Sequence, residues 1–176
     1  MKRIISLCCI ALLLCQATAL AIDREAYKKL EKEIREEMRI GGIGIGFPLG
    51  YVKSLYGEPS QIKWTDSIYG QAVHVGYIYS PNFIVGGKTR KDNPEQEDSI
   101  VIDTILLKDN FMTTPSGFTV GMPYSAVVEI YGESIHKTPT REPGIYSYLH
   151  GYKAYCMNFL VNSEGIITAI TMYIDE

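Results

Sequence analysis

The spacing of apolar residues changes along the chain and divides it into three regions. Residues Ile4 to Cys15 form a nearly continuous apolar run. Between Asp23 and Arg39, apolar residues recur at spacings of three and four, which is typical of one helical face. After about residue 43, short helical patterns are followed by apolar–polar alternation, which indicates strands.

The apolar run has the features of an export signal. Lys2 and Arg3 form a basic region before it, and an A-x-A cleavage pattern follows at residues 19–21. The run is shorter than the roughly 20 residues that a membrane-spanning helix needs. We expect residues 1–21 to be removed, which leaves an exported chain, periplasmic or secreted, without a membrane-spanning segment. An uncleaved anchor is one alternative. Lipid attachment at Cys15 is another, although the small residue that usually precedes a lipidated cysteine is missing.

Residues 22–40 are predicted to form a charged amphipathic helix. Twelve of the 17 residues from Asp23 to Arg39 are charged, six of each sign, and opposite charges four residues apart favour a solvated helix. A narrow apolar stripe would pack this helix along the domain, and it consists of Tyr27, Leu30, Ile34 and Met38. A spacer and a self-association helix are the alternatives. Gly41-Gly42 is predicted to end the helix.

The rest of the chain contains an internal repeat with an offset of 75 residues. Residues 45–58 (IGFPLGYVKSLYGE) align with residues 120–133 (VGMPYSAVVEIYGE), and the two share Gly, Pro, Val, Tyr, Gly and Glu. A second match joins Asn82–Val85 to Asn158–Val161 at an offset of 76. Self-similarity at a nearly fixed period indicates duplicated structural units.

Each unit is predicted to contain one helix and about three antiparallel strands. The units cover residues 43–110 and 118–176. A first-turn proline and a C-terminal glycine bound each helix, namely Pro48 and Gly57, then Pro123 and Gly132. The predicted strands are Ile68–Ser80, Asn82–Val85, Ile100–Lys108, Ile145–Leu149, Tyr152–Val161 and Ile166–Ile174. The fold class is therefore α+β, with two tandem helix-plus-antiparallel-sheet units that form one sheet.

The first unit has a long loop that the second unit lacks. Gly86–Ser99 carries seven charges and no large apolar residue, whereas the second unit has only the turn Asn162–Gly165 at this place. The loop is either a disordered excursion or a segment that reaches a partner. A further hairpin turn is predicted at His150-Gly151.

The helix pattern Gly-Met-Pro-x-x-x-Val-x-x-x-Tyr-Gly at Gly121–Gly132 resembles the signature of small envelope proteins of the SmpA/OmlA type. That group includes the E-subunit lipoprotein of the outer-membrane barrel-assembly machine, which has one such unit. The doubled arrangement over residues 45–176 is similar to the β-lactamase-inhibitor-protein fold, in which two tandem units form one concave sheet. The resemblance implies an assembly factor or an inhibitor-like protein. It assigns no contact residue, because the match lies in the helices.

Composition excludes several classes of protein. The chain is 46% hydrophobic with a formal net charge of −3, which is typical of a globular domain and not of a disordered segment or a basic nucleic-acid binder. Three of the four cysteines lie in the export signal, so Cys156 remains alone. A disulfide framework and a zinc site built on several cysteines are therefore excluded.

The candidate chemical groups do not form a recognisable catalytic, metal or cofactor site. Cys156 lies in a predicted strand near His150, where a small buried apolar residue is the ordinary role. His74, His136 and His150 lack the HxH and HExxH spacings of metal sites. The glycine-rich segment 41–46 lacks the Gly-Lys-Ser/Thr ending of a phosphate loop and is interpreted as a hinge between two helices. We expect no enzyme activity, no metal and no cofactor.

Tyrosine is the unusual feature of the composition, with 13 Tyr against 5 Phe and 1 Trp. Aromatic side chains with polar tips are enriched at recognition surfaces, although strands also favour them as half-buried residues. The candidate partner-binding residues are Trp64, Tyr69, His74, Tyr146, Tyr148 and His150, together with Lys88 and Arg90 of the charged loop.

These patterns predict an exported, non-enzymatic protein that binds another protein of the envelope or the extracellular space. The binding surface would be an aromatic face of the sheet together with the charged loop. The alternative is a binder of a small molecule or a cell-wall fragment in the sheet concavity. A small hydrolase is a third class, but the sequence has no catalytic set for it.

Overall fold

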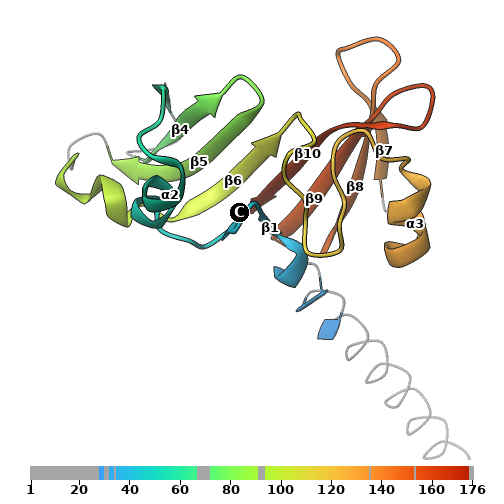
Figure 1. The fold of residues 1–176 in the computed structure, drawn as a ribbon, viewed down its shortest axis with the longest axis horizontal. Coiled ribbons are helices and arrows are strands. Elements are labelled where there is room, and N and C mark those ends of the chain that lie inside the picture. The colour runs from blue at the N-terminus through green and yellow to red at the C-terminus, as the bar shows by residue number, and fades with distance from the viewer. Residues whose placement is uncertain are drawn as a thin grey trace, which may run out of the picture.

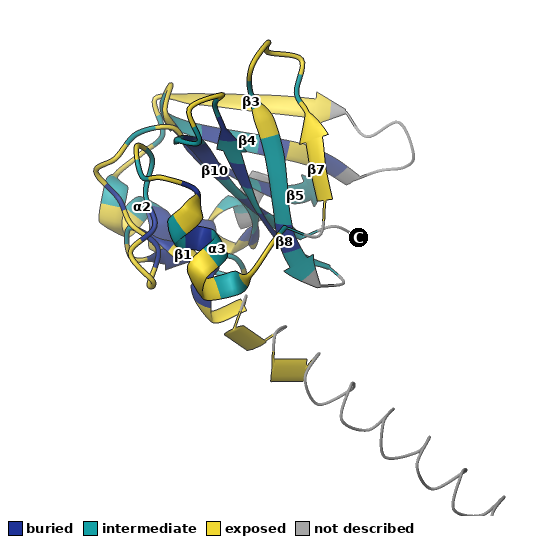
Figure 2. Cartoon of the chain, turned by 90° about the vertical axis from the view of Figure 1, so that its right-hand side faces the viewer, coloured by how far each residue is buried: buried dark blue, intermediate teal, exposed yellow. Residues whose placement is uncertain are grey.

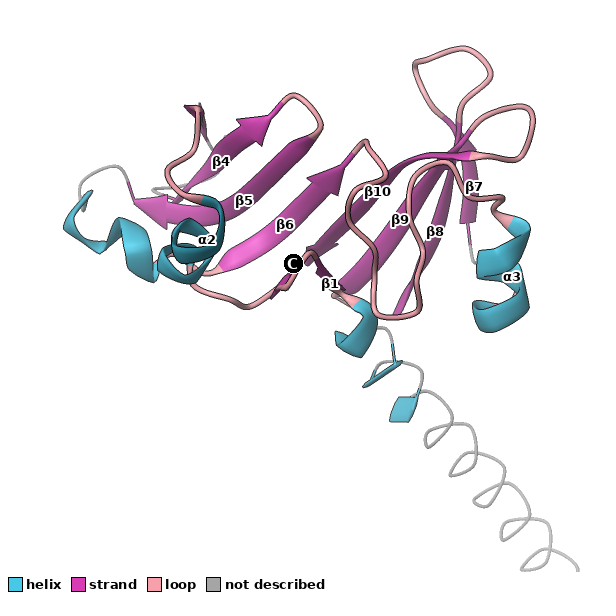
Figure 3. Ribbon diagram, viewed as in Figure 1, coloured by secondary structure: helices cyan, strands magenta, loops and turns pink. Residues whose placement is uncertain are grey.

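The computed structural model describes residues 28–29, 32–33, 35–66, 72–90, 94–134, 136–152 and 154–174. The predicted export signal, nearly half of the predicted charged helix (residues 22–27, 30, 31 and 34) and Tyr69 lie outside these residues. Within the described residues the fold is α+β, with one large antiparallel sheet and a few short helices (Figures 1 and 3). This confirms the predicted fold class at that level.

Eight strands of the described residues form the large sheet, in the order β3-β4-β5-β6-β10-β9-β8-β7. The first half of the sheet contains β3 (Gln61–Asp66), β4 (Ala72–Ser80), β5 (Phe83–Arg90) and β6 (Ile102–Leu107). The second half contains β7 (His136–Pro139), β8 (Tyr146–Tyr152), β9 (Tyr155–Val161) and β10 (Ile167–Ile174). Antiparallel pairing of β6 with β10 joins the halves, so β3 and β7 are the two edges.

The helices of both halves lie on the same side of the sheet (Figure 2). They are α2 (Leu49–Tyr56) and the 3₁₀ helix η1 (Pro94–Ser99) in the first half, and α3 (Ser125–Tyr131) in the second. Val52 of α2 and Val127 of α3 are fully buried, because each lies at the centre of its helix and faces the sheet. None of the helices in the described residues is long and apolar enough to cross a membrane.

One row of directly paired residues crosses the sheet on the helix side and forms the centre of the core. Side chains alternate between the two faces of a strand, so residues that pair directly across strands share a face. The row consists of Ile62, Tyr77, Val85, Ile105, Met172, Met157 and His150. All of these residues except Ile62, on the edge strand, are buried. The core is therefore continuous across both halves.

The two halves have matching hydrogen bonds between the segment before the helix and the last strand. Both sets hold the chain just before a helix proline against the start of β6 or β10. In the first half, the Gly46 N–H donates to the Ile102 carbonyl, and the Ile102 N–H donates to the Phe47 carbonyl. In the second half, the Gly121 N–H donates to the Ile167 carbonyl, and the Ile167 N–H donates to the Met122 carbonyl. Gly46 and Gly121 have φ values of 91° and 92°, in the left-handed region that favours glycine.

Residues 39–44 form a hairpin and not the predicted hinge between two helices. β1 (Arg39–Ile40) pairs with β2 (Ile43–Gly44) as a two-stranded sheet. Two consecutive turn residues with positive φ match the right-handed twist of a tight hairpin, and the glycines at 41 and 42 permit them. The charged helix ends before β1, since Met38 is the first residue after its helical conformation.

Two strands of the large sheet were not predicted, and one turn was placed wrongly. β3 and β7 are exposed edge strands (Figure 2). The polar sequence of β7 lacks apolar alternation, whereas β3 contains a short alternation, Ile62 and Trp64 between polar residues, that was not recognised. Tyr152 of β8 pairs with Tyr155 of β9, so β8 continues past His150-Gly151, where the turn was predicted. His150 is therefore a strand residue within the core row.

The predicted charged loop Gly86–Ser99 is largely ordered. Residues Gly86–Arg90 extend strand β5, and Pro94–Ser99 form η1 beside α2. The η1 backbone approaches α2 so closely at Gly50 that a β-carbon there would lie 3.1 Å from the Cβ atom of Asp98. A glycine at this position of α2 is what permits the contact.

Lys53 of α2 fastens η1 to the helix. Its Nζ atom lies 3.0 Å from Asp98 Oδ1, 3.2 Å from Glu97 Oε1 and 3.3 Å from Glu58 Oε2. Burial alone would lower the pKa of the Lys53 ammonium, but its hydrogen bonds to Asp98, Glu97 and Glu58 outweigh burial and raise the pKa. Lys53 therefore stays charged and neutralises a local excess of carboxylates.

Removing this cation should loosen η1. We expect Lys53→Met to lower the free energy of unfolding by about 1 kcal/mol, because several partly exposed ion pairs are lost and three carboxylates are left together. Urea unfolding followed by circular dichroism measures this change. Hydrogen exchange of the Ile100 N–H, which donates to the Glu97 carbonyl, should accelerate as η1 loosens. Lys108→Met, at an exposed lysine, is the matched control, and equal stability and exchange in the two variants would contradict this role of Lys53.

Candidate functional site

The candidate partner-binding residues do not lie together. Trp64 lies on β3 and His74 on β4, whereas Tyr146 and Tyr148 lie on β8 at the other end of the sheet. Trp64 pairs with Val75 on the helix side, while His74 pairs with Lys88 on the opposite face. Of Arg90, the structure describes the backbone at the end of β5 and not the side chain.

The face of the sheet that points away from the helices carries Tyr173 of β10 but not the predicted aromatic residues of β8. A directly paired row on this face consists of Gln61, Ile78, Ile84, Leu106, Thr171, Asn158, Leu149 and His136. Tyr146, Tyr148 and His150 pair instead with Val161, Phe159 and Met157, which are buried against the helices. The prediction of an aromatic open face is wrong for these residues, because their alternation places them on the helix side.

A groove between α3 and the β7–β8 edge brings two of the predicted aromatic residues to one place. Its volume is about 540 Å³. The lining comes from α3 and the residues on either side of it, from β7, β8 and the end of β9, and from the β9–β10 turn. It consists of Pro123, Tyr124, Ser125, Val128, Glu133, Lys137, Tyr148, Val161, Glu164 and Gly165. Tyr146 lies beside it on β8, with 38% of its surface exposed.

Aromatic rings and one cation form the wall of this groove on the sheet side. The rings of Tyr124 and Tyr148 have centroids 4.2 Å apart at an interplanar angle of 38°. The Lys137 ammonium lies 4.7 Å from the centroid of Tyr146 and 5.1 Å from that of Tyr148. Lys137 pairs directly with Tyr148 across β7 and β8, which places its side chain over both rings. A hydrogen bond to Tyr148 raises the pKa of Lys137, so it remains a cation.

His150 supports the groove from below and does not reach its surface. It is 5% exposed, and its Nε2 lies 2.8 Å from the Tyr124 hydroxyl. Burial lowers the pKa of His150 and raises the pKa of Tyr124 to about 12, so both groups are neutral at pH 7. A neutral pair can share one hydrogen bond, which holds the Tyr124 ring against Tyr148. The predicted surface role of His150 is therefore a positioning role.

Cys156 and His150 point to opposite faces of the sheet. Cys156 pairs with Gly151 and Tyr173, whereas His150 pairs with Met157 on the helix side. Adjacent strand residues alternate in direction, so these two side chains do not form a thiolate–imidazole pair. Among the described residues, no group of three or more His, Cys, Asp or Glu side chains could hold a metal ion.

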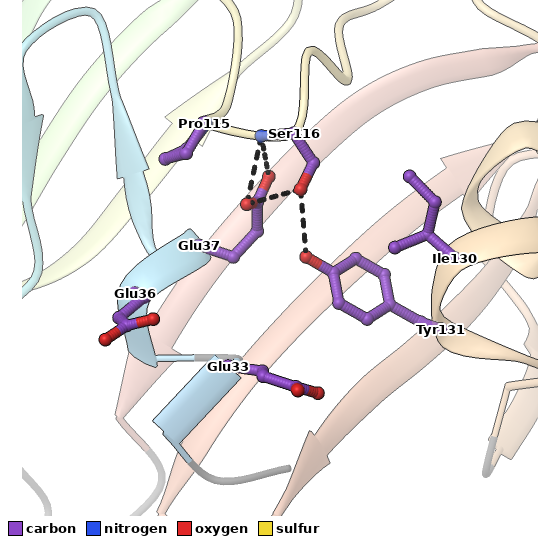
Figure 4. A pocket seen from close by; sticks show the side chains of 7 residues that line it. All are labelled: Glu33, Glu36, Glu37, Pro115, Ser116, Ile130 and Tyr131. Carbon is purple, nitrogen blue, oxygen red and sulfur yellow. Dashed lines mark hydrogen bonds between the residues drawn. The ribbon is translucent and has the colours of Figure 1, made fainter. Parts of the chain in front are cut away.

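A second cavity, of about 400 Å³, lies between the charged helix, the turn at Pro115-Ser116 and the end of α3 (Figure 4). Glu37 is 4% exposed, and both of its carboxylate oxygens accept the Ser116 N–H, at 2.9 and 3.0 Å. The Ser116 hydroxyl also donates to Glu37 at 2.9 Å and lies 3.4 Å from the Tyr131 hydroxyl. This carboxylate is fully engaged, so its structural role is to fasten the charged helix to the domain.

Several groove residues were missed from the sequence. Tyr124 and Val128 lie at helix positions that correspond to Leu49 and Lys53 at the offset of 75, and neither pair is identical. The difference in residue type between the two copies of the repeat was the sequence feature that could have identified these two positions. Lys137 had no such signal, because β7 itself was not predicted.

Acidification should destabilise the protein through His150. Its pKa is lowered in the folded state from the ordinary value of 6.5, so the unfolded chain binds this proton more readily. The stabilisation is fully present above pH 6.5 and is lost as the pH falls through the lowered pKa. We expect the melting temperature of wild type to fall more between about pH 7.5 and 5 than that of His150→Phe, as thermal melts will show.

Proton NMR titration of His150 gives a second measurement for this prediction. Because burial lowers the pKa of His150, we expect its ring resonances to titrate below the ordinary value of 6.5. A midpoint at or above 6.5 would contradict the buried, neutral state of His150.

No protein-family model matches the sequence, and a comparison with curated proteins found no significant match. An extracellular protein containing an SCP domain from Bacillus anthracis matches with a TM-score of 0.51 and 14% identity over 74% of this chain and 44% of its own. A DUF4309 family protein (YjgB) from Bacillus subtilis matches with a TM-score of 0.48 and 15% identity over 86% of this chain and 97% of its own. The uncharacterized protein yfeY from Escherichia coli matches with a TM-score of 0.47 and 12% identity over 78% of this chain and 97% of its own.

At these identities the comparisons concern the fold alone. The Bacillus anthracis structure is the one of these three with a TM-score above 0.5, and this chain spans less than half of its length. The chain is therefore similar in fold to part of a bacterial extracellular protein.

Proposed function

We propose that this chain is an exported, non-enzymatic protein that binds another protein of the cell envelope or the extracellular space. The α3–β8 groove would be its binding surface. The single observation that carries this proposal is the wall of Tyr146, Tyr148 and Lys137 at the exposed edge of the sheet. Tyrosine is one of the residue types that contribute most to protein–protein binding, and a charged residue such as Lys137 can select between partners.

The arrangement of the groove favours a protein over a small molecule. A groove of about 540 Å³ has the size of a ligand pocket, and Glu133 and Glu164 supply polar groups, which supports a cell-wall fragment as the second candidate. However, the Tyr124 ring packs against Tyr148 at an interplanar angle of 38°, and the Lys137 ammonium lies over the Tyr148 ring. Little aromatic face is left for a small ligand to stack on, whereas a protein surface can cover the whole wall.

We also propose that the fold arose by tandem duplication and is related to SmpA/OmlA-type units in an arrangement like that of the β-lactamase inhibitor protein. The support is the matching hydrogen bonds at Gly46 and Gly121 and the offset of 75 between them. The Asn82–Val85 match does not fit this framework. Val161 pairs with Ile167 at the start of β10, and Gly87 pairs with Ile102 at the start of β6. Val161 therefore corresponds to Gly87 and not to Val85. That match is therefore two residues out of structural register, and the helix match alone supports the duplication.

Export supports the same function. The signal-like pattern at residues 1–21 lies outside the described residues and stays a prediction. An extracellular protein among the similar structures agrees with export, without deciding between periplasm and secretion.

Substitutions in the groove should reduce capture of the partner. We expect Tyr146→Ala to weaken binding roughly tenfold or more, because an exposed aromatic anchor is lost, while the fold is kept. The measurement is affinity capture from envelope extracts with the full chain as bait, quantified by mass spectrometry. Trp64→Ala is the matched control, since Trp64 is 49% exposed on the opposite edge strand. Equal capture by wild type and both variants would reject the groove as the binding surface.

A further inference from the structure

The groove beside α3 has a counterpart beside α2 that is already filled. Positions 125 and 128 of α3 line the open groove, and positions 50 and 53 of α2 correspond to them at the offset of 75. Both of the α2 residues contact η1, since Gly50 lies against Asp98 and Lys53 binds Glu97 and Asp98. In the first half, a turn of the chain itself therefore occupies this place.

Among the described residues, the second half has no counterpart of η1 over its groove. In the first half, the β5–β6 connection runs from residue 91 to residue 101 and includes η1. The β9–β10 connection runs only from residue 162 to residue 166, and it forms the rim of the groove through Glu164 and Gly165. The same helix–sheet framework is therefore closed in one half and open in the other.

We propose that the α3–β8 groove binds a turn segment of a partner protein, in the place that η1 occupies on α2. This inference rests on the proposed function and names the kind of partner segment. The segment carries an apolar side chain at its centre and one carboxylate at the side of the groove near Lys137.

The residues that differ between the two grooves define this chemistry. Val128 of α3 corresponds to Lys53 of α2, which binds two carboxylates of η1. Because Val128 is apolar, the bound segment places an apolar side chain against it. Ser125 stands in place of Gly50, so its side chain keeps the occupant slightly farther from the helix than η1 is. Lys137 supplies an exposed cation on β7. Glu133 and Glu164 also line the groove and disfavour a strongly acidic segment.

Two synthetic peptides test this inference directly. One has the sequence of residues 91–102 of this chain, and the other has the same sequence with Asp98→Leu. The covalently attached η1 keeps the α2 groove filled at a high effective concentration, so an added peptide reports on the α3 groove. Binding to the ¹⁵N-labelled full chain is followed by NMR, and we expect shifts at Val128, Lys137 and Tyr148 and not at the Trp64 edge.

A reciprocal exchange makes the test specific. Wild type should bind the Asp98→Leu peptide at least about threefold more tightly than the native peptide, and Val128→Lys should reverse this preference. Lys137→Met should weaken binding of the Asp98→Leu peptide roughly threefold, whereas Lys63→Met on the opposite edge strand should leave it unchanged. Shifts outside the groove, no binding at millimolar peptide, or the same preference in wild type and Val128→Lys would overturn the inference.

The peptide test and the capture experiment distinguish failure of this inference from failure of the proposed function. If capture depends on Tyr146 but neither peptide binds in the groove, the protein-binding function stands and the turn segment is wrong. If the peptides bind as expected but capture does not depend on Tyr146, the groove accepts a turn and the proposed partner function is wrong.

Discussion

The pairing of β6 with β10 is the interaction on which the rest of the structure depends. It joins two four-stranded halves into one sheet and places Ile105 directly opposite Met172. Through this pair, the buried row from Tyr77 to His150 continues across both halves. Each half alone would expose an apolar strand edge at its centre, so the seam is what makes a single core possible.

One framework with two different fillings explains where the molecule is closed and where it is open. The hydrogen bonds at Gly46 and Gly121 hold the start of each helix against the last strand of its half in the same way. In the first half, η1 and its ion pairs to Lys53 cover the space between helix and sheet. In the second half, Tyr124 fills the inner part of this space and the outer part stays open as the groove. The proposed binding role follows from this difference, since η1 shows what the framework can hold.

Local rules predicted the parts of the fold that short segments decide. The prolines and glycines at the helix ends and the apolar alternation of the inner strands follow from helix capping and from burial, so α2, α3 and the strands next to the seam were predictable. The polar edge strand β7 was not, because backbone pairing with β8 makes it a strand without an apolar signal. The edge strand β3 was not predicted either, because its alternation of Ile62 and Trp64 with polar residues is short. The β8–β9 turn was misplaced because His150 looks like a turn residue but pairs with Met157 in the core.

The sequence by itself determined the α+β class, the antiparallel sheet and the offset of 75, because local propensity and period are properties of short stretches of chain. It also identified Tyr146 and Tyr148 as candidates, but it placed them on the wrong face. Only the tertiary structure decided that face, since the direction of a strand residue depends on the register of its neighbours and not on its own spacing. The open groove was decided in the same way, because it exists only where α3, β7, β8 and the short β9–β10 turn meet in space.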